Sequence, residues 1–157
     1  DLKIYIEEND LKYVQDDTNL NNDFDRNFLR NEIVPSLEKR WSKLSERAAL
    51  TSLTAKKKKL SLDFMLEKKF KKEIYTGIIE RAKFIEIPSF LVEELIRLIL
   101  RKKDIALPSQ KVLSEIMNVF FHKKPSNESY VEWSRKDGEQ IGGKVFSEHN
   151  DIILKKK

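Results

Sequence analysis

Hydrophobic residues recur at helical intervals along much of the 157-residue chain. An amphipathic segment runs from about Asp23 to Ile33, and Pro35 predicts a break after it because the residue before a proline is pushed out of the α region. Pro35 can itself open the next helix. From there to about Ile74 the apolar residues follow mostly helical spacing, interrupted near a run of lysines, which predicts one long helix or two in tandem.

Two further helices are indicated by their start signals. Pro88 and Ser89 begin the first, with Ser89 as its N-cap, and the basic residues 101–103 complement the negative end of its dipole. Its apolar surface is wide enough that most of it should be buried. Pro108 and Ser109 repeat the start signal for the next helix. The core stripe of that helix comprises Val112, Ile116, Val119 and Phe120.

Toward the C-terminus the hydrophobic period changes from helical to alternating. Val131 and Trp133 alternate with polar residues, and turn signals at 137–138 and 148–151 precede the apolar stretches 145–146 and 152–154. This pattern predicts a small antiparallel β-meander. The fold class is therefore expected to be mainly α (α+β), a helical module with a small C-terminal antiparallel β-meander, with Trp133, Phe120 and Phe121 in the core.

Composition excludes several kinds of protein. The chain has no cysteine, and His122 and His149 are too few and too far apart to make a metal site alone. No apolar run approaches the roughly 20 residues of a membrane-spanning helix, and the first residues do not resemble a signal peptide. A cytoplasmic, metal-free chain without a membrane partner is expected, and the absence of an initial methionine suggests a fragment of a longer protein.

The positive charge is concentrated in the middle of the chain. The net charge is +5, but residues 41–72 alone hold ten basic and three acidic side chains. A run of four lysines at 56–59 is the densest part of this region, and it could neutralise several phosphates of a nucleic acid. The alternative is an ordinary solvated helix face, which is where charged residues usually lie.

A polar segment at 16–30 offers the strongest chemical signal. On a helix, Arg26 and Arg30 are four residues apart and share one face with Asn27 beside them, which suits a phosphate or a nucleotide. The alternative is that these arginines pair with nearby carboxylates and only cap a helix. Those carboxylates are Asp16, Asp23 and Asp25.

This polar segment and the residues after it closely resemble the D-x-[ST]-N, RN-x-x-R, P-x-L and RW signature of the bacterial tRNA(Ile)-lysidine synthetases, which are N-type ATP pyrophosphatases. The matching residues are Asp16-Asp17-Thr18-Asn19, Asp25-Arg26-Asn27-Phe28-Leu29-Arg30, Ile33-Val34-Pro35-Ser36-Leu37 and Arg40-Trp41. Leu107-Pro108-Ser109 followed by Val112-Leu113 is similar to a segment of the family's second domain. Residues 42–84 match only in helical character and length.

The resemblance implies three regions. Residues 1–41 would be the C-terminal, helical end of an ATP-pyrophosphatase catalytic domain, 42–72 a connecting lysine-rich helix, and 73–157 a helical substrate-binding domain with the terminal β-meander. The family's SGG-x-DS ATP-binding loop is absent, so the fragment alone is expected to be inactive. A second departure is Gln140-Ile141-Gly142-Gly143, which stands where the family often places arginines and an aromatic residue.

The activity that the resemblance implies is ATP-dependent ligation of free lysine to the wobble cytidine of tRNA(Ile) with a CAU anticodon, giving lysidine, AMP and pyrophosphate. ATP would be used with Mg²⁺, at a site mostly in the missing N-terminal half, and a homodimer is compatible with the family. The residues implied are Arg26, Asn27 and Arg30 for catalysis, Asp16 and Asn19 for the loop at the ATP cleft, and Lys56, Lys57, Lys58 and Lys59 for tRNA binding.

Two other functions fit parts of the sequence. The parent could be another tRNA-modifying ATP pyrophosphatase, such as one that thiolates a wobble base, although those enzymes usually depend on cysteines. A non-catalytic helical adaptor could bind RNA or a protein through the lysine-rich helix, but it would have no use for the pattern at 16–30.

Overall fold

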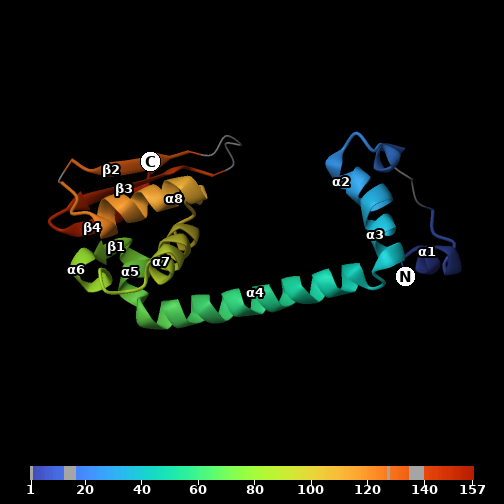
Figure 1. Cartoon of the computed structure of the whole chain (residues 1–157), viewed down its shortest axis with the longest axis horizontal. Helices are drawn as coiled ribbons and strands as arrows, with labels where there is room; N and C mark the ends of the chain where they lie inside the picture. Colours follow the sequence, from blue (N-terminus) through green and yellow to red (C-terminus); the bar gives the residue numbers. More distant parts are fainter. Residues whose placement is uncertain (1, 13–16, 127, 135–139) are drawn as a thin grey trace. The chain divides into compact units, whose positions relative to one another are not determined.

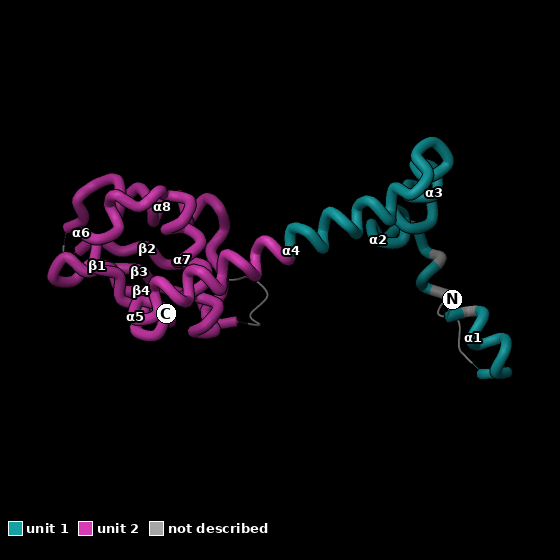
Figure 2. The backbone as a smooth tube through the Cα atoms, turned by 90° about the horizontal axis from the view of Figure 1, so that it is seen from below, with its two compact units in different colours: residues 1–56 teal, residues 57–157 magenta. Residues whose placement is uncertain are grey.

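A computed structural model describes residues 2–12, 17–126, 128–134 and 140–157. The chain forms two compact units, Asp1–Lys56 and Lys57–Lys157 (Figure 2). The first is helical, and the second combines helices with a four-stranded sheet (Figure 1). The expected fold class, mainly α with a small antiparallel sheet, is confirmed.

The first unit has little buried surface of its own. Among the side chains that the structure describes in it, only that of Asn27 is buried, and Phe24, Phe28 and Trp41 are exposed. Its elements are α1 (Leu2–Glu8), the 3₁₀ turn η1 (Asp17–Leu20), α2 (Asp25–Phe28), the π-helical turn η2 (Leu29–Ile33), α3 (Val34–Arg40) and the beginning of α4 (Leu44–Lys69).

The helix does not break at Pro35, so that prediction is wrong. Val34 keeps helical angles of φ −60° and ψ −48°, and its N–H donates to the carbonyl of Leu29, five residues back. This wide π turn gives the proline ring room that an ordinary α turn lacks, because the ring would meet the carbonyl four residues before it. The helix therefore runs through α2, η2 and α3 to Arg40.

Three helices occupy residues 35–74, and not the one or two that were predicted. α3 ends at Arg40, α4 begins at Leu44, and a second break lies at Phe70, which adopts φ −120° and ψ 39°. α4 continues without interruption through the lysine run, contrary to the interruption predicted there. Lysine is a good helix former, and the Lys59–Asp63 pair lies at the stabilising i, i+4 spacing. Leu66 is the one buried residue of this 26-residue helix.

The second unit contains one antiparallel sheet in the order β1-β4-β3-β2. Direct pairs such as Val131 with Val145 and Val145 with Leu154 set its register. The remaining elements are α5 (Lys71–Thr76), β1 (Ile78–Glu80), α6 (Arg81–Phe84), α7 (Ser89–Lys102), α8 (Gln110–Met117), the π turn η3 (Asn118–His122), β2 (Tyr130–Trp133), β3 (Gly143–Glu148) and β4 (Asp151–Lys156).

The predicted meander is extended by a strand that the sequence did not reveal. β1 pairs with β4, with Ile79 opposite Ile152. The second predicted turn is confirmed at His149 and Asn150, whose φ values of 50° and 70° suit a two-residue hairpin loop. The first, at 137–138, lies outside the described residues.

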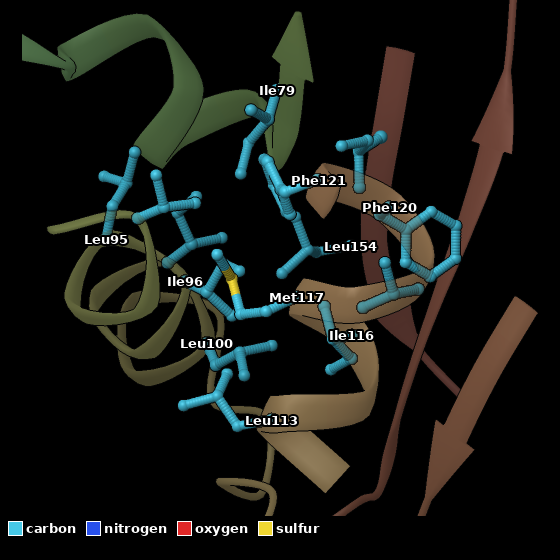
Figure 3. Packing of buried hydrophobic residues seen from close by; sticks show 14 of the residues in the cluster. Ile79, Leu95, Ile96, Leu100, Leu113, Ile116, Met117, Phe120, Phe121 and Leu154 are labelled. Carbon is cyan, nitrogen blue, oxygen red and sulfur yellow. The ribbon is translucent and has the colours of Figure 1, made fainter. Parts of the chain in front are cut away.

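The hydrophobic core lies between α7, α8 and one face of the sheet (Figure 3). Leu95 and Ile99 are completely buried, which confirms the wide apolar face predicted for α7, and Leu113 of α8 is buried with them. Trp133 is also in the core, as predicted, and its indole N–H donates to the carbonyl of Ala106 at 2.6 Å. Phe120 and Phe121 are buried with it.

The two predicted helix starts differ in outcome. Ser109 is the N-cap of α8, and its hydroxyl accepts a hydrogen bond from the Val112 N–H, as expected. Ser89 is not a cap, because Pro88 occupies that position and the Ser89 hydroxyl lies 3.2 Å from Nε2 of His122.

A span of the membrane would need a longer and more apolar helix than any found among the described residues.

Candidate functional site

Asn27 holds the polar loop onto the helix that carries the two candidate arginines. Its side-chain amide donates to the carbonyls of Thr18 at 2.7 Å and Asn21 at 2.8 Å. These bonds use both amide hydrogens, and the side chain is 7% exposed. Asn27 therefore positions the loop, because its donor group is already committed to the protein backbone.

A second asparagine on the same helix face adds to this arrangement. Asn31, four residues after Asn27, donates to the carbonyl of Asn19 at 3.2 Å and to Oδ1 of Asn22 at 2.9 Å. Asn22 in turn donates to Glu32 at 3.1 Å. The sequence interpretation missed Asn31 and Asn22, although the i, i+4 spacing of Asn27 and Asn31 was a usable signal.

The two arginines beside this loop are exposed. Within the ranges that the structure describes, neither Arg26 nor Arg30 has a side-chain hydrogen bond or ion pair, and Asp23 and Asp25 do not pair with them. Asp16, the third carboxylate of the capping alternative, lies outside the described residues. Both guanidinium groups are thus exposed and without a partner from the described residues, on a helix whose neighbouring loop is fixed by Asn27.

The lysine run separates into two parts. Lys56, Lys57 and Lys58 are exposed, and among the described residues their side chains form no ion pair. Lys59 is half-buried, pairs with Asp63, and lies 3.3 Å from Oε2 of Glu94, an ion pair without hydrogen-bond geometry. Lys59 therefore joins α4 to α7 and is less available to RNA than its three neighbours.

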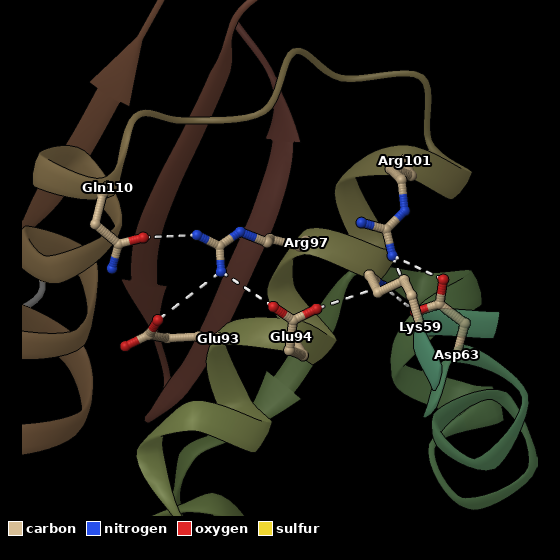
Figure 4. A network of polar contacts seen from close by, with 7 residues as sticks. All are labelled: Lys59, Asp63, Glu93, Glu94, Arg97, Arg101 and Gln110. Atoms are coloured by element: carbon tan, nitrogen blue, oxygen red, sulfur yellow. Dashed lines mark hydrogen bonds and ion pairs between the residues drawn. The ribbon is translucent and has the colours of Figure 1, made fainter. Parts of the chain in front are cut away.

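The ion pairs around Lys59 join α4 to α7, and a hydrogen bond from Arg97 extends this network to α8 (Figure 4). The guanidinium of Arg101 donates to both oxygens of Asp63, at 3.0 and 3.1 Å. Arg97 donates to Glu94 at 3.2 Å and to Gln110 of α8 at 2.7 Å. Such partly exposed pairs orient α4, α7 and α8 more than they stabilise the unit.

A metal-ion site is not evident in the part of the chain that the structure describes. It contains no group of three or more histidine, cysteine, aspartate or glutamate residues arranged to hold a metal. The exposed guanidinium groups of Arg26 and Arg30 are suited instead to an anionic ligand, because each presents a rigid fork of donors that matches phosphate oxygens.

Replacing Asn27 by alanine should loosen the polar loop, because the carbonyls of Thr18 and Asn21 would lose their donors. We expect a local cost of about 1–3 kcal/mol, seen as faster amide hydrogen exchange at residues 17–22. Asn9→Ala is the matched control, since Asn9 also donates to a backbone carbonyl, that of Tyr5 at 2.8 Å, but is exposed. Unchanged exchange in Asn27→Ala would contradict the positioning role.

Comparisons with known proteins found similarity to one family over most of the chain. Residues 1–37 match the family model described as a PP-loop domain. The tRNA(Ile)-lysidine synthase of Buchnera aphidicola subsp. Acyrthosiphon pisum is 32% identical over 133 residues, covering 83% of this chain and 30% of the relative. That of Coxiella burnetii is 30% identical over 165 residues, covering 98% and 35%. The chain spans about a third of the length of the curated relatives it matches.

The helix and loop that hold Arg26, Asn27 and Arg30 thus lie in a segment of PP-loop type. The similarity to the curated relatives continues through the second unit, well beyond the PP-loop match. The chain belongs to the tRNA(Ile)-lysidine synthase family.

Proposed function

We propose that this chain is part of an enzyme that uses ATP to attach free lysine to the wobble cytidine of tRNA(Ile) with a CAU anticodon. In this reaction the cytidine is first adenylated, with release of pyrophosphate, and the ε-amine of lysine then displaces AMP. The observation that carries the proposal is that the exposed guanidinium groups of Arg26 and Arg30 have no partner among the described residues, in the segment that matches a PP-loop domain.

Arg26 and Arg30 would contact the phosphates of ATP or of the adenylated nucleotide. Charge that develops on phosphate oxygens during nucleotidyl transfer is stabilised best by donors that are already in place. The hydrogen bonds of Asn27 supply that order by fixing the loop beside the helix. Asn19, whose carbonyl accepts from Asn31, would shape the loop at the cleft together with Asp16.

The exposed apolar surface of the first unit supports its assignment to a larger catalytic domain. Phe24 is 58% exposed, Leu29 51% and Trp41 54%, and the described side chains around them form no hydrophobic core. We propose that other parts of a PP-loop domain cover these residues, with the domain ending near residue 41. Residues 42–72 would connect it to a substrate-binding domain at 73–157.

The lysines at 56–58 support RNA binding by the same protein. Their side chains are exposed and unpaired among the described residues, whereas Lys59 is held by Asp63 and Glu94. We therefore place the backbone contacts of the tRNA mainly on Lys56, Lys57 and Lys58. Magnesium-bound ATP, a cytoplasmic location and a homodimer complete the proposal for the whole enzyme.

Neutralising the three exposed lysines together, as Lys56→Gln, Lys57→Gln and Lys58→Gln, should weaken tRNA binding and reduce its salt dependence. Each lost phosphate contact reduces the magnitude of the slope of log K against log salt by about 0.7–0.9, so the magnitude should decrease by about 2 in the triple variant. Fluorescence anisotropy with a labelled tRNA(Ile) transcript measures this slope. The control replaces three exposed lysines elsewhere, Lys111, Lys123 and Lys124. Equal slopes for the two triple variants would show that the lysine run is an ordinary solvated helix face.

The function itself is tested with the complete synthase that we propose contains this chain. The enzyme is incubated with ATP, labelled lysine and a tRNA(Ile) transcript with a CAU anticodon, and a transcript with a CAC anticodon serves as control. Label in the CAU transcript alone supports the proposal. A folded enzyme that labels neither transcript would refute it and favour a different modification of the wobble base.

A further inference from the structure

A cationic groove lies in the second unit, whereas Arg26 and Arg30 belong to the first. It has a volume of about 320 Å³ and is bordered by the end of α4, by α5 and by the end of α7. Two exposed aromatic rings and four lysines lie along it. These residues are Phe64, Tyr75, Lys68, Lys71, Lys102 and Lys103.

The groove carries more positive charge than its own carboxylate can neutralise. Lys102 pairs with Glu67 at 2.6 Å, which raises the pKa of the lysine, and Lys103 donates to the carbonyl of Tyr75 at 3.0 Å. Lys68 and Lys71 have no ion-pair partner among the described residues. Four lysines against one glutamate leave a net positive surface that is suited to a polyanion.

Helix stability accounts for some of these lysines but not for all. Lys68 and Lys102 lie in the last turns of α4 and α7, where a positive charge complements the negative end of the helix dipole. Lys71 is the first residue of α5, where a positive charge meets the positive end of the dipole and is unfavourable. Its exposed position beside Lys68 is better explained by an anionic ligand.

The aromatic rings narrow the choice of polyanion. Phe64 is 61% exposed and Tyr75 is 74% exposed, although both border the same groove. Nucleic acids without base pairs combine phosphates with open base faces, and such bases stack on exposed rings in cationic channels. A duplex would offer phosphates without free base faces, and an acidic peptide would have no need of the two rings.

We propose that this groove binds unpaired nucleotides of an RNA, with backbone phosphates at Lys68 and Lys71 and a base stacked on Tyr75. The identity of the RNA rests on the proposed function, which makes tRNA(Ile) with a CAU anticodon the natural probe. The groove would thus add a second RNA contact to that of Lys56, Lys57 and Lys58.

The test uses the 157-residue chain and measures its affinity for a fluorescent tRNA(Ile) transcript by anisotropy. The double variant Lys68→Gln with Lys71→Gln should bind about tenfold more weakly at ~0.1 M salt. The magnitude of its slope of log K against log salt should decrease by about 1.5. The matched control is Lys111→Gln with Lys124→Gln, which removes the same charge from exposed positions outside the groove and should change affinity less than twofold. Equal losses in the two double variants would overturn the proposal.

Stacking is tested separately with an unpaired RNA oligonucleotide that carries 5-iodouridine. Irradiation should crosslink it to Tyr75 or Phe64, and Tyr75→Ala should lower affinity about tenfold with an unchanged circular dichroism spectrum. Crosslinks only at residues outside the groove would overturn the proposal. So would displacement of the RNA by polyglutamate at equal charge concentration, because an acidic peptide would then fit equally well.

The groove proposal and the proposed function can be wrong independently, and the experiments distinguish the two cases. If the complete synthase does not incorporate lysine but Lys68→Gln with Lys71→Gln still weakens RNA binding, the function is wrong and the groove stands. If lysine incorporation is normal and RNA affinity is unchanged in that variant, the function stands and the groove proposal is wrong.

Discussion

A complete synthase that carries Arg26→Ala or Arg30→Ala is expected to lose at least ~100-fold of its rate of lysine incorporation. Removing one preorganised donor from developing negative charge typically costs 10²–10³ in rate, or about 3–4 kcal/mol. Neither guanidinium has a partner among the described residues, so the free energy of unfolding of each variant should lie within about 0.5 kcal/mol of that of the parent. The loss should therefore be catalytic and not a loss of folding.

The measurement is incorporation of labelled lysine into a tRNA(Ile) transcript with a CAU anticodon. Arg47→Ala is the control, because Arg47 is an exposed arginine of α4 in the same unit and should leave the rate within twofold. Arg30→Lys should recover only part of the activity, since an ammonium group cannot form the bidentate contact of a guanidinium. Near-normal activity of both alanine variants would exclude Arg26 and Arg30 from the reaction.

Local signals predicted two helices of the second unit, α7 and α8. α8 has a serine cap at Ser109 and an apolar stripe, and α7 ends with the basic residues that its dipole favours. Each of these features acts over a few residues of sequence. Burial of Leu95 and Ile99 is then expected because the apolar face of α7 is too wide to remain in water.

Features that depend on distant partners were missed. β1 is three residues long, and its pairing with β4 joins Ile79 to Ile152, more than 70 residues later. No period can be recognised in so short a strand. The prediction of a break at Pro35 was wrong for a related reason, because a general rule about prolines could not reveal the π turn at Leu29–Ile33 that accommodates the ring.

In the candidate sites, too, features set by local sequence could be predicted, and features that depend on distant partners could not. The spacing of Arg26 and Arg30 could be read from the sequence, since it depends only on the helical repeat. The separation of Lys59 from Lys56–Lys58 could not, because its partner Glu94 comes from another helix. The groove was also missed, since Tyr75 and Lys102 are brought together only by the packing of α5 against α7.

Two glycines close to Trp133 account for one departure from the family pattern. A Cβ on Gly143 would lie 2.3 Å from the indole ring of Trp133, and a Cβ on Gly142 would lie 2.1 Å from the carbonyl oxygen of Trp133. Both distances are far below van der Waals contact. Glycine is therefore required at 143 by the indole ring of Trp133 and at 142 by the close approach of the Trp133 backbone carbonyl, independently of any contact with tRNA.

Gly142→Ala and Gly143→Ala should each lower the free energy of unfolding of the second unit by about 3 kcal/mol or more, because neither neighbour can move without disturbing the core. Chemical denaturation followed by far-ultraviolet circular dichroism measures this. The two variants differ in the atom that each methyl group meets, which is a side-chain ring for Gly143 and a backbone carbonyl for Gly142.

Trp133→Leu separates the two cases in a double-mutant cycle. Shortening this side chain should recover about 1–3 kcal/mol of the cost of Gly143→Ala, because it removes the ring that the new methyl group would meet. It should recover almost none of the cost of Gly142→Ala, since the backbone carbonyl stays in place. Equal recovery in both cycles would show that the glycines respond to a general loosening of the sheet and not to the ring of Trp133.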